Sequence, residues 1–206
     1  MTKFIDLSRD IVDNMVVHPY DDQVKLYQDK YLEKDKYNNF RLEIGMHAGT
    51  HIDTPMHLLN EKMFISEIPL DKFAGKGCLL DVRGERIIGF KQEYTDVVNE
   101  NDIVILFTNY RDGYGTEEYF TNHPVVNKDL GDFFVEKKIK MLGMDLPSPD
   151  KYPFRIHKKL LENNILIIEN LTNLSELANI KSFTIIAFPL KIKAEAAMAR
   201  VVASID

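Results

Sequence analysis

The sequence predicts an α/β fold with mixed sheets and a few helices. Apolar runs of strand length recur along the whole chain, and stretches with helical periodicity lie between some of them. Several runs are continuous rather than alternating, which is typical of strands covered on both faces. A chain of 206 residues suits one domain, 1–206, whose core needs neither a disulfide nor a structural metal.

Seven apolar runs are predicted to be strands. They are residues 4–7, 77–82, 103–108, 140–144, 165–168, 183–190 and 200–205. Each has the length and apolar character of a buried strand. The order of the strands within a sheet does not follow from these runs.

Two stretches are predicted to be helices. Residues 127–138 carry an apolar stripe and end in a basic turn. Residues 155–163 end at an Asn-Asn pair, which favours a left-handed stop. The alanine-rich segment 193–198 is also predicted to be helical. Residues 18–39 are polar and rich in tyrosine, and we expect a long loop or mobile arm near the site.

Composition excludes several classes of function. The net charge of −6 and the lack of a basic patch disfavour a nucleic-acid partner. The start of the chain does not resemble a signal peptide, and no run of about 18 apolar residues predicts a membrane span. Cys78 is the single cysteine, so an internal disulfide is excluded, and we expect a buried thiol rather than a catalytic one. These features favour a cytoplasmic protein with a small-molecule substrate.

Four acid–base side chains lie within eleven residues: His47, His51, Asp53 and His57. Imidazole and carboxylate are ligands that zinc and manganese accept. Histidine also moves protons near neutral pH. This segment therefore predicts a site that combines a divalent metal with a general base.

The spacing requires a bend between the first two histidines. A flat strand from His47 to His51 spans about 13 Å, whereas a zinc–nitrogen bond is about 2 Å. Gly49 lies midway and takes bent conformations at little cost. Pro55 argues against a helix. We expect a strand that ends near Met46, a bend at Gly49, and a rigid loop for the rest.

His157 and Glu169 are the best candidates for the remaining ligands. Glu169 closes the aliphatic run 165–168, where a carboxylate is costly unless a cation or hydrogen-bond donors satisfy it. Ends of strands are also where α/β proteins place binding groups. Two alternatives stay open: the strand simply reaches the surface at Glu169, and His157 is an exposed helix residue.

The run 47–57 resembles the signature of the metal-dependent cyclase family, which includes bacterial kynurenine formamidase (arylformamidase) and isatin hydrolase. Further blocks are similar and follow in family order: 115–120 with His123-Pro124, 143–148 with Asp150, 169–171, and 189–192. The resemblance covers nearly the whole chain. The short length is closer to the formamidases.

The resemblance implies a swivelling β/β/α fold, usually in a dimer or larger assembly, so we expect a homodimer or homotetramer. It implies one or two divalent ions, with zinc expected first and manganese as the alternative. His47 and His51 would bind one ion, Asp53 would bridge two, His157 would bind the second, and Glu169 would contact both. His57 would be the proton donor and acceptor. The implied activity is metal-dependent hydrolysis of the carbon–nitrogen bond of a formyl amide or cyclic amide.

The chain departs from the formamidase pattern near its N-terminus. A Trp-Pro-Gly-Asp segment is replaced by His18-Pro19-Tyr20-Asp21, and the chain has no tryptophan. His18 and Tyr20 could still stack on a substrate ring, and we expect them to bind substrate. The alternatives to formamide hydrolysis are a lactonase, an isatin-type ring hydrolase, or a metal-binding protein without catalysis.

Overall fold

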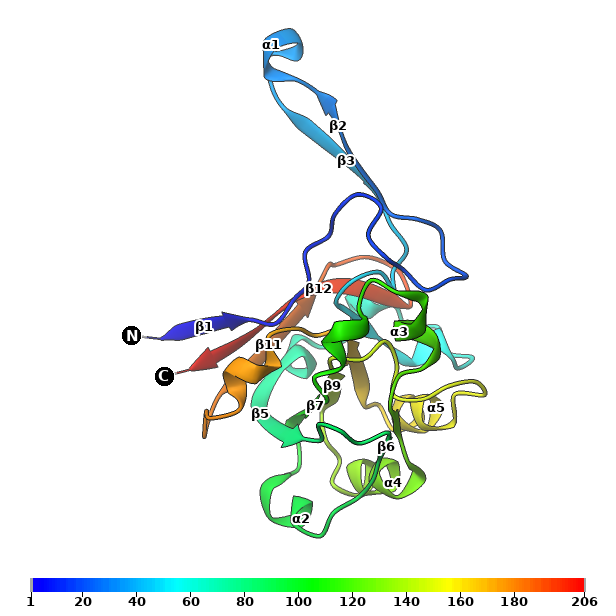
Figure 1. Cartoon of the computed structure of the whole chain (residues 1–206), viewed down its shortest axis with the longest axis vertical. Coiled ribbons are helices and arrows are strands. Elements are labelled where there is room, and N and C mark those ends of the chain that lie inside the picture. The colour runs from blue at the N-terminus through cyan, green and yellow to red at the C-terminus, as the bar shows by residue number, and fades with distance from the viewer. Residues whose placement is uncertain (1, 206) are drawn as a thin grey trace.

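The computed structural model describes residues 2–205, except for the side chains at positions 111 and 112. Its main strands are β1 Lys3–Asp6, β4 His51–Asp53, β5 Ala74–Asp81, β7 Ile103–Phe107, β9 Met141–Met144, β10 Leu166–Glu169, β11 Thr184–Pro189 and β12 Ala196–Ile205. They form one sheet in the order β1-β12-β11-β5-β7-β9-β10-β4, and β12 also pairs with β4. All but β1 are thus joined in a closed, barrel-like sheet (Figure 1).

The direction of the strands is mixed. Neighbours among β5, β7, β9 and β10 are parallel, and the other pairs are antiparallel. The predicted α/β class with mixed pairing is confirmed. All seven predicted runs coincide with strands, although β12 begins at Ala196 rather than at residue 200. The carboxyl ends of the four parallel strands lie at one edge of the sheet, and Glu169 is the last residue of β10.

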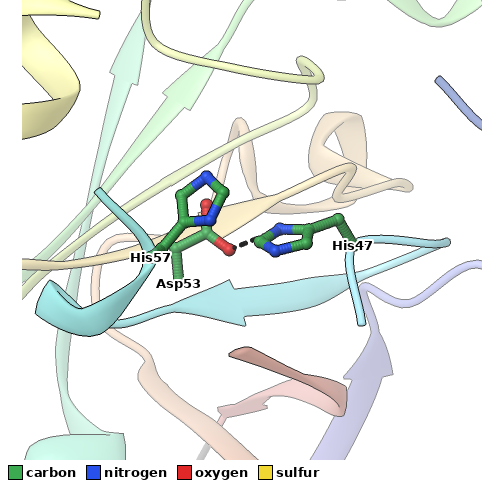
Figure 2. A group of neighbouring side chains, drawn as sticks. All are labelled: His47, Asp53 and His57. Atoms are coloured by element: carbon green, nitrogen blue, oxygen red, sulfur yellow. Dashed lines mark ion pairs between the residues drawn. The ribbon is translucent and has the colours of Figure 1, made fainter. Parts of the chain in front are cut away.

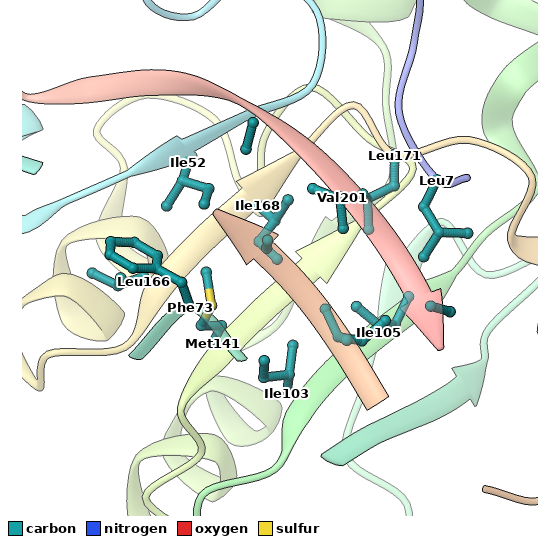
Figure 3. Close-up of a cluster of buried hydrophobic side chains, with 14 of the residues drawn as sticks. Leu7, Ile52, Phe73, Ile103, Ile105, Met141, Leu166, Ile168, Leu171 and Val201 are labelled. Carbon is teal, nitrogen blue, oxygen red and sulfur yellow. The ribbon is translucent and has the colours of Figure 1, made fainter. Parts of the chain in front are cut away.

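Two apolar cores explain why the strands are continuously hydrophobic. Alternate residues of a strand point to opposite faces. On β7, Ile103 and Ile105 join the core between the strands of the closed sheet (Figure 3). Val104 and Leu106 join a second core on the outer face, together with side chains of the two longest helices. Both faces of the strand are therefore buried, as the sequence predicted.

The longest helices are α4 Lys128–Glu136 and α5 Arg155–Glu162, and they confirm the two helices expected at 127–138 and 155–163. Asn127 caps α4 by accepting from the Leu130 N–H at 2.9 Å. Asn164 has the expected left-handed conformation, with a φ of 56°. No helix among the described residues is long and apolar enough to cross a membrane.

The remaining elements are short. They are α2 Tyr94–Val97, α3 Glu117–Thr121, the 3-10 turns η1 Pro55–His57, η2 Ile65–Glu67, η3 Leu70–Phe73, η4 Tyr110–Gly113 and η5 Leu174–Leu177, and the paired β6 Ile87–Ile88 and β8 Val125–Val126. A third apolar cluster ties the N-terminal loop to the segment before β4. It contains Met15, Val17, Val24 and Ala48.

The expectation of a long loop at 18–39 is wrong in part. Strands β2 Lys25–Lys30 and β3 Asn39–Glu43 pair as an antiparallel ribbon, with α1 Leu32–Asp35 at its tip. This ribbon projects from the body as an arm (Figure 1). Charged pairs across the arm help to fix its register. They are Lys25–Glu43 and Arg41–Asp29.

The expected helix at 193–198 is wrong. Ala196 already begins β12, and Ala196, Ala197 and Met198 pair with β4. Alanine has a high helix propensity, but a ladder between this segment and a buried strand overrides it. The small side chains suit this position because Ala196 and Ala197 are fully buried.

Candidate metal centre

The ladder between β4 and β10 places three ligand candidates on one face. His51 is the ladder partner of Glu169, and Asp53 points the same way because it lies two residues after His51. Ile52 lies between them and packs into the inner core. His51 Nε2 lies 3.4 Å from Asp53 Oδ1 and 3.4 Å from Glu169 Oε2.

A bend at Gly49 brings His47 to the same place. Gly49 has a φ of 66°, a left-handed conformation that glycine adopts without strain. The centroids of the His47 and His51 rings are 5.0 Å apart. His47 Nδ1 lies 2.9 Å from Asp53 Oδ1. The predicted bend is confirmed. The strand expected to end near Met46 is β3, which ends at Glu43. The expectation of a loop for the rest is wrong in part, because residues 51–53 form β4.

His157 joins the cluster from α5. Its Nε2 lies 3.1 Å from Asp53 Oδ2, and its Nδ1 lies 4.0 Å from Glu169 Oε1. The start of α5 is held by Asp150, whose carboxylate accepts from the Ile156 N–H at 2.7 Å. His157 is 3% exposed and Glu169 is 4% exposed. Both alternatives are therefore wrong: neither side chain is at the surface.

His57 borders the cluster from η1, directly after β4. Its ring is 4.2 Å from the His47 ring and 5.5 Å from the His157 ring. Figure 2 shows it beside Asp53 and His47, with the His47–Asp53 ion pair dashed. Burial lowers the pKa of His57 to about 4, so its imidazole is neutral near pH 7. Its position alone suits either a ligand or a proton carrier, since His47, Asp53 and His57 offer ligand atoms within 4.8 Å of one another.

Unpaired buried atoms show that the cluster fits a cation. Among the described residues, His51 Nε2 and Glu169 Oε1 are buried without a hydrogen-bond partner, and buried Asp53 Oδ1 has His47 Nδ1 at 2.9 Å as its close ionic contact. The Nδ1 atom of His51 must carry the proton, because it donates to the Gly49 carbonyl at 2.9 Å. The Nε2 atom of the same ring faces the two carboxylates. Such unpaired groups are costly, and their donor atoms are those that divalent metals accept.

The pKa values of the two carboxylates are shifted in opposite directions. Burial opposes ionisation of Asp53, but His47, His51 and His157 outweigh it and hold the pKa of Asp53 well below its usual value. Burial and the neighbouring charge of Asp53 raise the pKa of Glu169 well above its usual value. The cluster thus favours one carboxylate charge and resists a second. A divalent cation would favour ionisation of both.

Three neighbours of the cluster were not proposed from the sequence. Glu195 Oε1 lies 3.3 Å from His47 Nε2, and Ser148 Oγ lies 3.4 Å from His157 Nδ1. The Asn170 amide donates to the Gly49 carbonyl at 3.0 Å and so supports the bend. Ser148 and Asn170 lie inside blocks that resemble the family. Glu195 had no such signal, because its segment was expected to be helical.

His18 and Tyr20 contact each other, and His18 also contacts α3. The His18 ring is 5.4 Å from that of Tyr20 and 5.7 Å from that of Phe120 on α3. Tyr20 is 94% exposed. These contacts place the pair against α3 rather than within the histidine cluster. Their role in substrate binding stays a prediction.

Comparison with known proteins identifies the family. The model of the Cyclase family matches residues 5–151, which is more than half of the chain. This chain belongs to the cyclase family. The resemblance seen in the sequence is therefore confirmed.

The similarity to known relatives and solved structures extends over nearly all of this cyclase-family chain. A kynurenine formamidase from Bacillus cereus is 27% identical over 92% of this chain and 90% of its own length. An uncharacterised protein from Methanocaldococcus jannaschii is 31% identical over 89% of this chain and 90% of its own. Isatin hydrolase A from Ralstonia solanacearum superposes with a TM-score of 0.86 at 17% identity, covering 100% of this chain and 92% of that one. This likeness confirms the cyclase-like fold.

Proposed function

We propose that this protein is a metal-dependent amidohydrolase that cleaves the carbon–nitrogen bond of a formyl amide, in the manner of a kynurenine formamidase, or of a cyclic amide. One observation carries the proposal. Buried, unpaired imidazole and carboxylate atoms face one another beside a neutral histidine. The kinship with a kynurenine formamidase across most of the chain supports the choice of bond.

The proposed metal site consists of His47, His51, Asp53, His157 and Glu169. Asp53 suits a bridging position, because its Oδ1 faces His47 and His51 while its Oδ2 faces His157. We propose one or two divalent ions, zinc first and manganese as the alternative. When bound, such an ion supplies an activated water and polarises the amide carbonyl.

We propose that His57 moves the proton. An amide nitrogen must be protonated before it leaves, and a positioned general acid–base contributes about 10²- to 10⁴-fold. His57 is neutral near pH 7 and partly buried beside the cluster, so it can accept a proton from the attacking water. It can then donate that proton to the leaving nitrogen.

The test is His57→Ala. We expect the variant to keep the metal content of the wild type, measured by elemental analysis, and to lose about 10²- to 10⁴-fold in kcat on a formyl amide. Near wild-type turnover would remove His57 from the mechanism. Loss of metal together with turnover would instead make His57 a ligand.

A second candidate is ring opening of an isatin-type cyclic amide, which the close superposition with an isatin hydrolase favours. A lactonase would use the same centre with an oxygen leaving group. A panel of formyl anilides, isatin-like rings and lactones, assayed with added zinc or manganese, separates these substrates. A protein that turns over none of them would be a metal-binding protein without catalysis.

We propose further that residues 1–206 act as one domain within a homodimer or homotetramer in the cytoplasm. The arm supports an assembly, because it exposes large apolar side chains. Cys78 is buried and free, which suits a reducing compartment. No nucleic acid or membrane is needed for the proposed reaction.

A further inference from the structure

Arg9, outside the histidine cluster, has shielded donor atoms with no acceptor in the part of the chain that the structure describes. The guanidinium of Arg9 lies over the ring of Tyr114, 3.5 Å from its centroid. Its Nε and Nη2 atoms are shielded from solvent, and neither has a hydrogen-bond partner among the described residues. The Tyr114 hydroxyl is also buried without a partner. Unpaired donors of this kind are costly, so they indicate an acceptor from outside the described chain.

This unpaired arginine is attached to the metal centre from two sides. The backbone N–H of Arg9 donates to Thr50 Oγ1 at 3.0 Å, and Thr50 directly precedes His51. The Tyr114 ring packs edge-on against Tyr119 at 5.2 Å. The Tyr119 hydroxyl donates at 2.9 Å to Asn170, the residue after Glu169.

The charge of Arg9 also affects the pKa of Tyr119. Burial raises the pKa of Tyr119 well above its usual value, and the positive charge of Arg9 opposes that rise. Beyond Tyr119, the aromatic contacts continue through Phe120 to His18, which we expect to bind substrate.

The geometry selects the class of ligand. A stack on Tyr114 fixes the guanidinium plane and leaves the N–H groups of Nε and Nη2 unpaired at its edge. A carboxylate matches that edge with two parallel hydrogen bonds, and a tyrosine hydroxyl can add a third. A neutral amide would satisfy fewer of these donors and would not balance the charge.

We propose that Arg9 and Tyr114 bind a carboxylate group of the substrate, so that this centre prefers amides that carry an acidic group. The proposal deepens the amide-hydrolase function proposed above and rests on it. It makes Arg9 a determinant of specificity rather than a catalytic residue. An acidic side chain from a second copy of the chain is the competing acceptor, and the experiment below distinguishes it.

The experiment compares two formyl amides that differ in one group, formanilide and 2-formamidobenzoate. Metal-loaded wild type should show a higher kcat/KM for the acidic compound. Arg9→Gln should reduce this preference by roughly 10- to 100-fold, through KM rather than kcat, since hydrogen bonds to charged groups have this magnitude. Arg9→Lys should recover part of it, because lysine keeps the charge but lacks the fork.

Binding of 2-formamidobenzoate to metal-stripped protein gives a second readout, because no ion is then present to attract the carboxylate. Arg9→Gln should weaken this binding by a similar factor. Tyr114→Phe should weaken the binding of 2-formamidobenzoate less. It is the replacement test if Arg9→Gln does not fold. The matched control is Arg83→Gln, since Arg83 also lies over an aromatic ring but is exposed and paired with Asp81.

Failure of this proposal is distinct from failure of the proposed function. If the metal-loaded wild type hydrolyses neither amide, the amide-hydrolase function fails, and the binding comparison still decides the assignment of Arg9. If Arg9→Gln keeps the preference and the binding of the wild type, the carboxylate proposal is wrong. A change of oligomeric mass in Arg9→Gln with unchanged preference would assign the arginine to a contact between copies.

Discussion

Asp53 and Glu169 are neighbours in one buried cluster, yet their pKa values are shifted in opposite directions. The three histidines around Asp53 favour its charge, and that charge then disfavours a second one on Glu169. Burying such groups without a cation costs free energy of folding. We infer that the arrangement is held for binding rather than for stability. Residues selected for function are often unfavourable for stability in this way.

His123 provides a pH test at the residue scale. It is buried outside the ligand cluster, and its Nδ1 lies 2.8 Å from the Pro124 carbonyl. Burial lowers its pKa to about 4, whereas an unfolded histidine titrates near 6.5. The unfolded state therefore binds more protons between these values. The contribution of His123 to the free energy of unfolding should be fully present above about pH 6.5. It should decrease as the pH falls towards 4, by roughly 3 kcal/mol in total.

Chemical denaturation at pH 7 and pH 4.5 measures this effect. The free energy of unfolding should decrease more for the wild type than for His123→Gln, whose side chain does not titrate. Equal decreases in the two proteins would show that His123 titrates normally in the folded state.

Close packing at Gly77 leaves no room for a side chain on β5. A Cβ atom on Gly77, in β5, would lie 2.0 Å from the ring of Phe183. Phe183 is itself buried, so it has little freedom to move. Gly77→Ala should therefore reduce the free energy of unfolding by about 1–3 kcal/mol.

The matched control for this prediction is Gly45→Ala. A Cβ atom there would have nothing within 4 Å, and Gly45 does not have a positive φ. We expect this variant to unfold within about 1 kcal/mol of the wild type. Similar losses in the two alanine variants would mean that backbone freedom, not the Phe183 contact, decides the effect.

Elements with a strong local signal were predictable from the sequence, and elements made by tertiary pairing were not. Strands such as β7 are apolar on every residue, and α4 has both a stripe and a capping Asn127. By contrast, β4 has only three residues, and two of them are polar. It is a strand because β10 and β12 pair with it on either side. The same pairing overrides the helical propensity of 193–198.

The candidate site was predictable from the sequence in part, as the secondary-structure elements were. The residue types and the bend at Gly49 followed from spacing, and the structure brings His157 and Glu169 to the same cluster. The contribution of Glu195 was missed because it depends on where β12 begins. Arg9 was missed because an isolated arginine has no signal until its missing acceptor is visible.

The arm is the feature of the whole molecule that supports the proposed assembly. An isolated two-stranded ribbon is marginally stable in water, and none of residues 25–43 is buried. Its charged side chains pair largely within the arm, which leaves apolar groups uncovered. They are Tyr27, Tyr31, Leu32, Tyr37, Phe40 and Leu42. We propose that a second copy of the chain covers them.

Replacement of residues 25–43 by a short Gly-Ser linker tests this proposal. Lys25 and Glu43 are ladder partners, so a short linker can join the flanking residues. The variant should still unfold cooperatively, because the cores are intact, and should have a lower oligomeric mass by light scattering. An unchanged mass would assign the assembly to another surface.

The central claim is that the bend at residues 47–53 and the end of β10 bind one divalent centre together. Calorimetric titration of metal-stripped protein with zinc or manganese tests it most directly, with Glu169→Gln as the variant and the exposed Glu176→Gln as its control. We predict saturable binding in the wild type and in the control, and an affinity at least about 10-fold weaker in Glu169→Gln. Binding of equal strength in all three proteins, or no binding in the wild type, would contradict the claim.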